Sequence, residues 1–257
     1  MRQSISYVLL ITCAIFVFSC KTQFVQKSYE TDNVPVSEEV GAMDSTIVKL
    51  YAPYKKILEK DMNRVLVISD NELVKDKPES LLTNFLADLL LEQGANVARD
   101  QNLKLTPDVS FFNYGGIRST LPKGEITVGN IFELMPFENE MVLLELKGEQ
   151  MQAFLDYIAN HGGGSVGGVK MIIANDKATE VKIGGEKIDY NRNYCLVTND
   201  YVAAGGDGLE MLEENQQYIN SGEKIRDAII AYLEDLGNKK QHVAPQLDGR
   251  ISYETSL

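Results

Sequence analysis

The sequence predicts a mixed α/β (α+β) fold, a single domain over residues 41–257 in which strands and helices are interspersed. Apolar residues recur at helical spacing in several long segments. Short runs rich in β-branched residues lie between those segments. No linker-like stretch and no internal repeat interrupts residues 41–257, so elements of both kinds are expected to share one core.

The helices follow from the apolar spacing and from capping residues. The clearest covers residues 81–94, where leucine and phenylalanine side chains form one wide stripe and Gly94 is expected to end the helix. Thr127 is a suitable cap for a short helix at 128–134. Further helices are predicted over residues 43–59, 150–160 and 223–236.

The strands are predicted from short apolar runs. A strand over residues 108–112 leads directly into one glycine-containing loop, and a strand over 194–198 leads into another. The pair Gly184-Gly185 is typical of a tight turn between strands. Further strands are expected at 65–68, 142–146, 169–174 and 180–183.

The N-terminal segment differs from the rest of the chain. Its apolar run, residues 7–18, is too short to span a bilayer as a mature helix. The pattern is typical of a secretory signal peptide over residues 1–19. Residues 17–20 resemble a bacterial lipobox, which favours a lipoprotein with lipid on Cys20. A plain signal peptide with an incidental cysteine is the alternative.

A polar stretch separates this segment from the domain. Residues 20–40 are poor in large apolar side chains, so they are expected to form a flexible tether. A lipid on Cys20 would hold the protein at the membrane of a bacterial cell envelope, on its periplasmic or its surface face. Cys13 would leave with the signal peptide, and Cys195 lies in an apolar run, so Cys195 is expected to be a buried thiol outside any disulfide.

Charge and composition exclude some functions. The formal net charge of −12 argues against nonspecific nucleic-acid binding through a basic face. The only two histidines, His161 and His242, are expected at the surface, and there is no HExxH or CxxC motif. Carboxylates alone can bind magnesium or calcium, but no acidic cluster surrounds Asp207. The sequence therefore predicts no metal ligands in this chain.

Two short motifs overlap at residues 162–167. The glycines satisfy GxGxxG, and Ser165 lies in a GxSxG match. A dinucleotide site and a nucleophile elbow both require a strand before the motif and a helix after it. Here a helix is predicted before and a strand after, so the segment is interpreted as a flexible glycine loop.

The loop after strand 108–112 carries groups suited to a ligand. Asn113 can hydrogen-bond a ligand or its own backbone. Gly115 and Gly116 would allow positive φ and a close approach of a ligand to the main chain. Arg118 offers a planar fork of donors for a carboxylate or a phosphate.

A second loop repeats this combination with Tyr201, Gly206 and Asp207. Tyr201 and Phe137, which follows Pro136, could sandwich a flat ring, and such stacking is worth about 1–3 kcal/mol for a nucleic-acid base. A carboxylate suits a pair of sugar hydroxyls. The residues alone do not decide between this interpretation and a simpler one, in which both loops are turns and both aromatic residues belong to the core.

Several segments around these loops resemble the C-terminal domain of the 5′-nucleotidase family. A helix with Asn84 and Asp88 is similar to the helix that opens that domain. The similarity covers about residues 64–252, in the family's order. The matching segments are NYGGIR at 113–118, GEITVGNIF at 124–132, MPFEN at 135–139, TNDYVAAGGDG at 198–208 and LDGRI at 247–251.

The resemblance implies a substrate-binding domain. In the family, the C-terminal domain binds the nucleoside part of the substrate, and an N-terminal domain carries two metals and the catalytic histidine–aspartate pair. By resemblance, Asn113 and Arg118 line the substrate site and Asp207 meets the ribose hydroxyls. Phe137 and Tyr201 stack on the base, with tyrosine in place of the usual phenylalanine.

Two departures from the family shape the functional hypothesis. Where the family often has an arginine before the opening helix, this sequence reads KPE, so that cation is either missing or supplied by Lys77. No metallophosphatase half precedes the domain in this sequence, which implies a split enzyme. This chain would bind the nucleotide or nucleoside without catalytic residues or a cofactor of its own, and a separate metallophosphatase chain would supply the divalent metals. The alternatives are a lipid-anchored binding protein without a catalytic partner, and a degenerate domain kept for protein contacts.

Overall fold

The computed structural model describes residue 28, residues 31–33 and residues 44–254. The predicted signal peptide, Cys20 and most of the predicted tether lie outside these residues. Contacts divide the chain into two units, Met1–Lys49 and Leu50–Leu257. Among the described residues, no helix has both the length and the apolarity that crossing a membrane requires.

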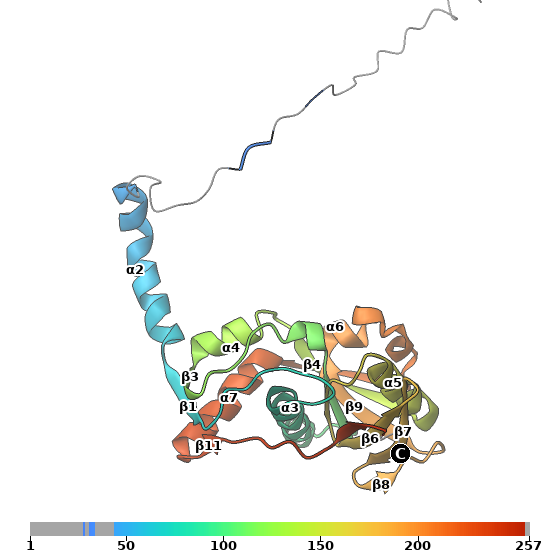
Figure 1. Ribbon diagram of the computed structural model, residues 1–257. Helices are drawn as coiled ribbons and strands as arrows, with labels where there is room; N and C mark the ends of the chain where they lie inside the picture. The colour runs from blue at the N-terminus through green and yellow to red at the C-terminus, as the bar shows by residue number, and fades with distance from the viewer. Residues whose placement is uncertain (1–27, 29–30, 34–43, 255–257) are drawn as a thin grey trace, which may run out of the picture. The chain divides into compact units, whose positions relative to one another are not determined.

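A five-stranded sheet organises the second unit, and Figure 1 labels two of its central strands, β4 and β9. The strand order is β10-β4-β9-β2-β5. β2 and β9 are parallel, whereas β4 is antiparallel to β9. Three of these strands were predicted within one or two residues at each end. β5 was not predicted, because it lies within residues 162–167, which were interpreted as a flexible glycine loop, and its three residues are instead buried in a strand. β10 was not predicted. The strands are β2 (Val109–Phe112), β4 (Glu140–Lys147), β5 (Ser165–Gly167), β9 (Asn193–Asn199) and β10 (Gln217–Lys224).

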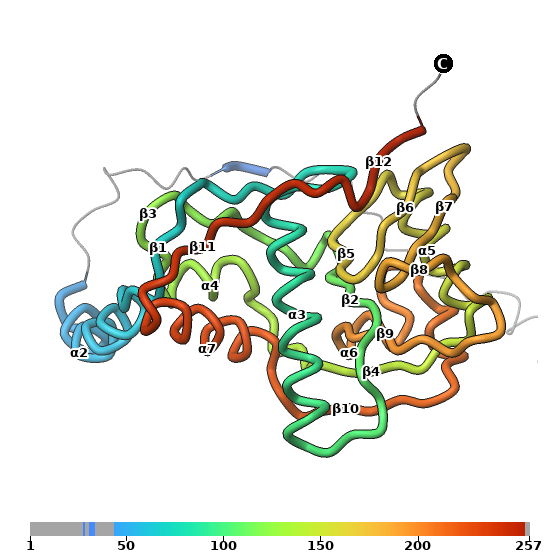
Figure 2. Tube along the Cα trace, turned by 90° about the horizontal axis from the view of Figure 1, so that it is seen from below, coloured from blue at the N-terminus to red at the C-terminus, as the bar shows by residue number. Residues whose placement is uncertain are grey.

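Helices cover both faces of this sheet. α3 (Leu81–Asp100) packs on β2 and β5, and α5 (Gly148–Asn160) packs on β4. Successive side chains of a strand point to opposite faces, so Phe111 joins the apolar cluster that includes α5, and Phe112 joins the cluster that includes α3. α7 (Ile225–Asn238) lies beside α3 (Figure 2) and extends the second cluster.

Two smaller sheets contain strands from near the C-terminus. One has the order β11-β1-β3 and the other the order β12-β6-β7-β8. The predicted Gly184-Gly185 turn joins β7 to β8. The bounds are β1 (Val65–Ser69), β3 (Gly124–Thr127), β6 (Val169–Ala174), β7 (Lys177–Ile183), β8 (Glu186–Lys187), β11 (His242–Val243) and β12 (Ile251–Tyr253).

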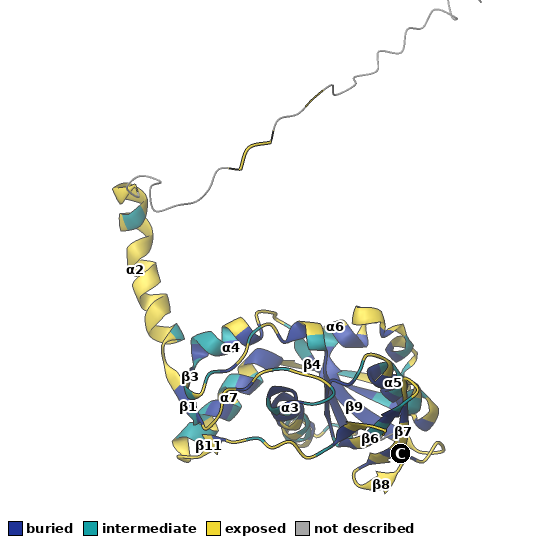
Figure 3. Cartoon of the chain, viewed as in Figure 1, coloured by how far each residue is buried: buried dark blue, intermediate teal, exposed yellow. Residues whose placement is uncertain are grey.

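The prediction that Gly94 ends α3 is wrong. The helix continues to Asp100, and half of its residues are buried, which Figure 3 draws in dark blue. A Cβ atom at Gly94 would lie 2.8 Å from Cγ2 of Val197 on β9, which is closer than real contacts allow. The glycine therefore serves close packing of the helix on the sheet.

The other helices that were predicted from the sequence lie within three residues of the predicted bounds. Thr127 caps α4 (Val128–Leu134), because its hydroxyl accepts from the backbone N–H of Asn130. α2 (Ser45–Met62) contains no buried residue. Short helical turns that were not predicted follow β2, β9 and α6; they are η1 (Tyr114–Gly116), α6 (Asp200–Ala203), η2 (Gly206–Gly208) and η3 (Glu210–Glu214).

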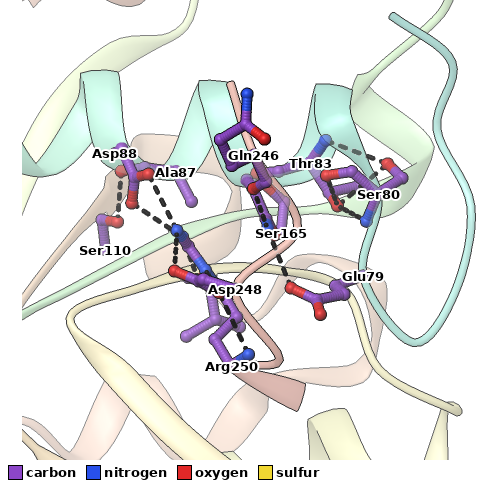
Figure 4. Close-up of polar contacts among 12 residues, drawn as sticks. Glu79, Ser80, Thr83, Ala87, Asp88, Ser110, Ser165, Gln246, Asp248 and Arg250 are labelled. Carbon is purple, nitrogen blue, oxygen red and sulfur yellow. Dashed lines mark hydrogen bonds and ion pairs between the residues drawn. The ribbon is translucent and has the colours of Figure 1, made fainter. Parts of the chain in front are cut away.

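Buried hydroxyl groups tie the backbone of α3 to the sheet (Figure 4). The Ser110 hydroxyl donates to the Ala87 carbonyl at 2.6 Å, and the Ser165 hydroxyl donates to the Thr83 carbonyl at 2.7 Å. Ser165 is fully buried and lies in β5, with α5 preceding it. The strand–turn–helix context of a nucleophile elbow is absent from this described segment, and the Ser165 hydroxyl has a structural role.

An arginine near the C-terminus makes the densest polar contact in Figure 4. Arg250 is 8% exposed, and its guanidinium donates to both carboxylate oxygens of Asp88 on α3 at 2.7 and 2.8 Å. It also donates to Asp248 at 2.9 and 3.0 Å. The matching segment LDGRI at 247–251 therefore holds the C-terminal strand against α3.

Cys195 is buried on β9, as predicted. Burial, reinforced by the charges of Asp108 and Glu145, raises the pKa of its thiol to about 12.

Candidate functional site

Three segments far apart in the sequence meet at one end of the central strands of the five-stranded sheet. β2 and β9 are parallel, so the loop that follows β2 and the helix α6 that follows β9 both start at the carboxyl ends of these strands. β4 is antiparallel to β9, with Met141 opposite Asn199, so the loop before β4 lies at the same end. Ligands commonly bind outside the carboxyl ends of parallel strands.

A cavity of about 330 Å³ lies among these segments. Both predicted aromatic residues, Phe137 and Tyr201, line it, although they come from different loops. Seven of the eight residues predicted for the site are in its lining, and Gly206 is the exception. The lining consists of Asn113, Gly115, Gly116, Arg118, Met135, Phe137, Asn139, Tyr201 and Asp207.

The aromatic side chains are not core residues. Phe137 is 43% exposed and Tyr201 is 48% exposed. The plainer interpretation, in which both residues pack in the interior, is therefore wrong. Gly206 packs directly against the Tyr201 ring, because a Cβ atom there would lie 2.5 Å from the ring.

A hydrogen-bond network fixes the polar wall of the cavity. Asn113 donates to one carboxylate oxygen of Asp207 at 2.8 Å, and the Tyr201 hydroxyl donates to the other at 2.9 Å. Asn199, which is buried, donates to the Asn113 side-chain oxygen at 3.0 Å. The bond to Asp207 raises the pKa of Tyr201, so the tyrosine stays a donor. The carboxylate is thereby oriented before any ligand arrives.

Of the two glycines in the first loop, Gly116 is required by a close contact and not by its φ. Neither Gly115 nor Gly116 has a positive φ, so that part of the prediction is wrong. A Cβ atom at Gly116 would lie 2.7 Å from the side-chain oxygen of Asn113. In the second loop, Asp207 takes a left-handed conformation with φ of 59°, and Gly205 and Gly208 also have positive φ.

Three cations surround the first loop. Arg118 is exposed and donates to the Gly115 carbonyl at 3.1 Å. The Lys75 ammonium donates to the Ile117 carbonyl at 2.6 Å, and burial together with the charge of Arg118 lowers its pKa. The Lys77 ammonium lies 4.8 Å from the ring centre of Tyr114. Positive charge is thus concentrated at this loop in a chain with a net charge of −12.

A second cavity of about 360 Å³ adjoins the first and shares Asn113, Gly115 and Asp207 with it. Its further lining includes Lys77 and Tyr157. The Tyr157 hydroxyl donates to the backbone carbonyl of Asp207 at 2.5 Å.

Sequence reasoning did not assign a site role to Asn139, Lys75 or Tyr157. Asn139 lay within the segment MPFEN, so a signal existed, and its side chain donates to Asp200 at 2.8 Å. The other two offered none: Lys75 is one lysine among many, and Tyr157 lies on a helix whose apolar face gives no sign of its hydroxyl contact.

The described residues include no group of three or more histidine, cysteine, aspartate or glutamate side chains that could hold a metal ion. His161 and His242 are both exposed.

Fold and site together define a mixed α/β domain with a preformed cavity at the carboxyl ends of β2 and β9. The family model of the 5′-nucleotidase C-terminal domain matches residues 62–214. The chain belongs to this family.

Relatives and solved structures agree. The trifunctional nucleotide phosphoesterase protein YfkN of Bacillus subtilis is 32% identical over 203 residues, which cover 73% of this chain and 13% of that protein. A 5′-nucleotidase of Vibrio vulnificus is 24% identical, with 74% of this chain and 34% of the relative covered. The crystal structure of a 5′-nucleotidase precursor from Thermus thermophilus matches with a TM-score of 0.67 and 26% identity, over 84% of this chain and 45% of that one. The chain thus spans less than half the length of each.

Proposed function

We propose that this domain binds a nucleotide or nucleoside, with the base between Phe137 and Tyr201. The observation that carries the proposal is the shared cavity, in which two half-exposed aromatic side chains from separate loops lie beside a carboxylate and a guanidinium. Aromatic side chains on both sides suit a flat ring, and Asn139 in the same lining can donate to or accept from its edge.

Asp207 is the proposed partner of the ribose hydroxyls. Each carboxylate oxygen already accepts one hydrogen bond, from Asn113 or from Tyr201. An ionised carboxylate offers about four acceptor positions, so two remain for a vicinal diol. Because Asn113 and Tyr201 already hold the Asp207 carboxylate in place, ligand binding does not have to fix its orientation.

The cations are the proposed partners of the phosphate. Arg118 is exposed at the cavity, and Lys75 and Lys77 flank the same loop. Lys77 and Lys75 would together take the place of the arginine that this sequence lacks before α3. A fork of guanidinium donors and two ammonium groups suit a dianionic phosphate.

The binding proposal is tested by calorimetric titration of the protein with adenosine, AMP and UDP-glucose, without metal. Phe137→Ala should weaken the binding of adenosine and of AMP by about 5- to 150-fold, as expected for a lost stacking partner. Arg118→Ala should weaken AMP more than adenosine, because only AMP carries the phosphate. Tyr190→Ala is a matched control, since Tyr190 is an exposed aromatic residue that lines neither cavity. Binding of AMP that is absent, or unchanged in Phe137→Ala, contradicts the proposal.

Catalysis is proposed to need a separate metallophosphatase chain. The support is the missing ligand set within the described residues and the greater length of the curated relatives. Pure protein should not hydrolyse AMP when magnesium, manganese or zinc is added, and activity should appear when a metallophosphatase that lacks this domain is co-expressed with it. Turnover by the pure protein refutes the split. Saturable binding without any restoring partner favours the non-catalytic binding protein.

The proposed location is the bacterial cell envelope, through lipid on Cys20. The N-terminal sequence carries this proposal, since these residues lie outside the described ones. Radiolabelled palmitate should be incorporated into the native chain and not into Cys20→Ser. Equal labelling of both, or of neither, contradicts it.

A further inference from the structure

Arg226 is a buried arginine that lines neither cavity. It lies in the first turn of α7 and is 6% exposed. Its Nε atom is buried and has no hydrogen-bond partner among the described residues. A positive charge is unfavourable at a helix N-terminus, where the helix dipole is also positive, and Lys224 adds another. Contacts other than those of its own helix must explain this placement.

The hydrogen bonds and the ion pair of Arg226 all go to the loop that carries Phe137. The Arg226 guanidinium donates to the Phe137 carbonyl at 3.3 Å and lies within 3.5 Å of the Met135 carbonyl. It forms an ion pair with Glu138, and its Cζ atom lies 4.2 Å from the ring centre of Phe132 on α4. One planar group thus holds both sides of Pro136.

Within the described residues, Arg226 provides all the hydrogen bonds that tie the backbone of residues 135–138 to elements beyond α4. The neighbouring residue continues the attachment, because the Ile225 N–H donates to the Asn139 carbonyl at 3.0 Å. Lys224 and Arg226 together lower the pKa of Glu138 to about 2, so the carboxylate is ionised at neutral pH.

The loop held by Arg226 is joined to the opposite wall of the cavity. The Asn139 side chain donates to an Asp200 carboxylate oxygen at 2.8 Å, and the Tyr201 N–H donates to the same oxygen at 2.9 Å. The position of Phe137 relative to Tyr201 therefore depends on the backbone that Arg226 fixes.

We propose that Arg226 is a positioning residue for ligand binding, which sets the Phe137 ring against Tyr201 by holding the carbonyls on both sides of Pro136. This rests on the proposed nucleotide-binding function. It goes beyond that function because Arg226 lines neither cavity and acts through the loop backbone.

The first test reports the loop without a ligand. The chain has no tryptophan, so Phe137→Trp places a single indole at the tip of the loop. Arg226→Met in that background should lower the fluorescence anisotropy of the indole and raise its quenching by acrylamide. Arg250→Met is the matched control, because Arg250 is an equally buried arginine whose carboxylate partners lie outside both cavities. It should leave both readings unchanged. Circular dichroism confirms that each variant is folded at the temperature used.

The second test is a double-mutant cycle on AMP affinity with native Phe137 and with Phe137→Ala. Arg226→Met should raise the dissociation constant by about tenfold in the native background and cause no further change in the Phe137→Ala background. Arg250→Met should leave it unchanged in both. If Arg226→Met does not fold, Arg226→Lys replaces it, since a lysine keeps the charge and loses the fork of donors.

The outcomes separate the two claims. Failure of the native protein to bind AMP contradicts the proposed function, and the indole readings still decide the role of Arg226. Indole readings that do not respond to Arg226→Met, or that respond equally to Arg250→Met, overturn the positioning role. So does a tenfold loss that persists in full in the Phe137→Ala background.

Discussion

The contact between Arg250 and α3 gives a stability prediction that can be worked from its geometry. Arg250→Met removes a guanidinium that is 8% exposed and donates to Asp88, Asp248 and the Val166 carbonyl. Breaking a fully buried ion pair costs about 3–5 kcal/mol, because the remaining charge stays buried. Here the two carboxylates are 56% and 52% exposed, so both regain water when the arginine is lost.

The expected loss is therefore about 2–3 kcal/mol in the free energy of unfolding, near the value for hydrogen bonds to charged groups. This corresponds to a fall of about 5–10 °C in melting temperature for a domain of this size. The assay is urea unfolding followed by far-ultraviolet circular dichroism, with m-values compared to confirm that the same surface unfolds. Arg250→Lys should recover part of the loss and not all of it.

The same contact predicts a dependence on pH. The hydrogen bond from Arg250 lowers the pKa of Asp248 below its ordinary value of 3.8. A carboxylate with a lowered folded-state pKa contributes stability above its unfolded pKa and loses it as the pH falls through the folded value. The difference between native protein and Arg250→Met should therefore narrow below about pH 4. A loss under about 0.5 kcal/mol at pH 7, or a difference as large at pH 2 as at pH 7, would refute the reasoning.

Three further substitutions or modifications follow from close contacts and burial. Gly116→Ala places a Cβ atom 2.7 Å from the Asn113 side-chain oxygen, so AMP affinity should fall about tenfold with a small loss of stability, as calorimetry and melting curves can show. Gly163→Ala would press a Cβ atom against the Pro78 carbonyl oxygen at a position whose φ is 101°, so it should lower the free energy of unfolding, measured in urea, by more than about 2 kcal/mol. Cys195, with a thiol pKa of about 12, should react with a thiol reagent at pH 8 only in denaturant, in a variant whose two N-terminal cysteines are serine; rapid native labelling would contradict its burial.

Local features of the fold could be predicted from the sequence, because they are encoded within a few residues. The apolar stripe of α3 and the cap at Thr127 depend on spacing and on one side chain. The predicted end of α3 was wrong because Gly94 was interpreted as a helix stop. A glycine is needed there because the helix packs closely against Val197 on β9. A contact between residues so far apart in the chain leaves no local signature.

The candidate site shows the same division. Turn chemistry and the family resemblance identified residues on both loops, from Asn113 to Asp207. That these loops share one cavity follows from the pairing order β4-β9-β2, which no local pattern specifies. Tyr157 and Arg226 were missed for this reason, since each acts on a segment that only the tertiary fold brings near.

The C-terminal strands have a consequence for the order in which the chain can fold. β1 pairs with β11, and β6 pairs with β12, so strands from residues 242–253 form part of both smaller sheets. Asp88 gains its arginine partner only when residue 250 is present. Domains generally fold as units, and this one cannot complete its contacts without its final residues. A chain truncated before residue 242 should therefore expose apolar surface that the full-length protein covers.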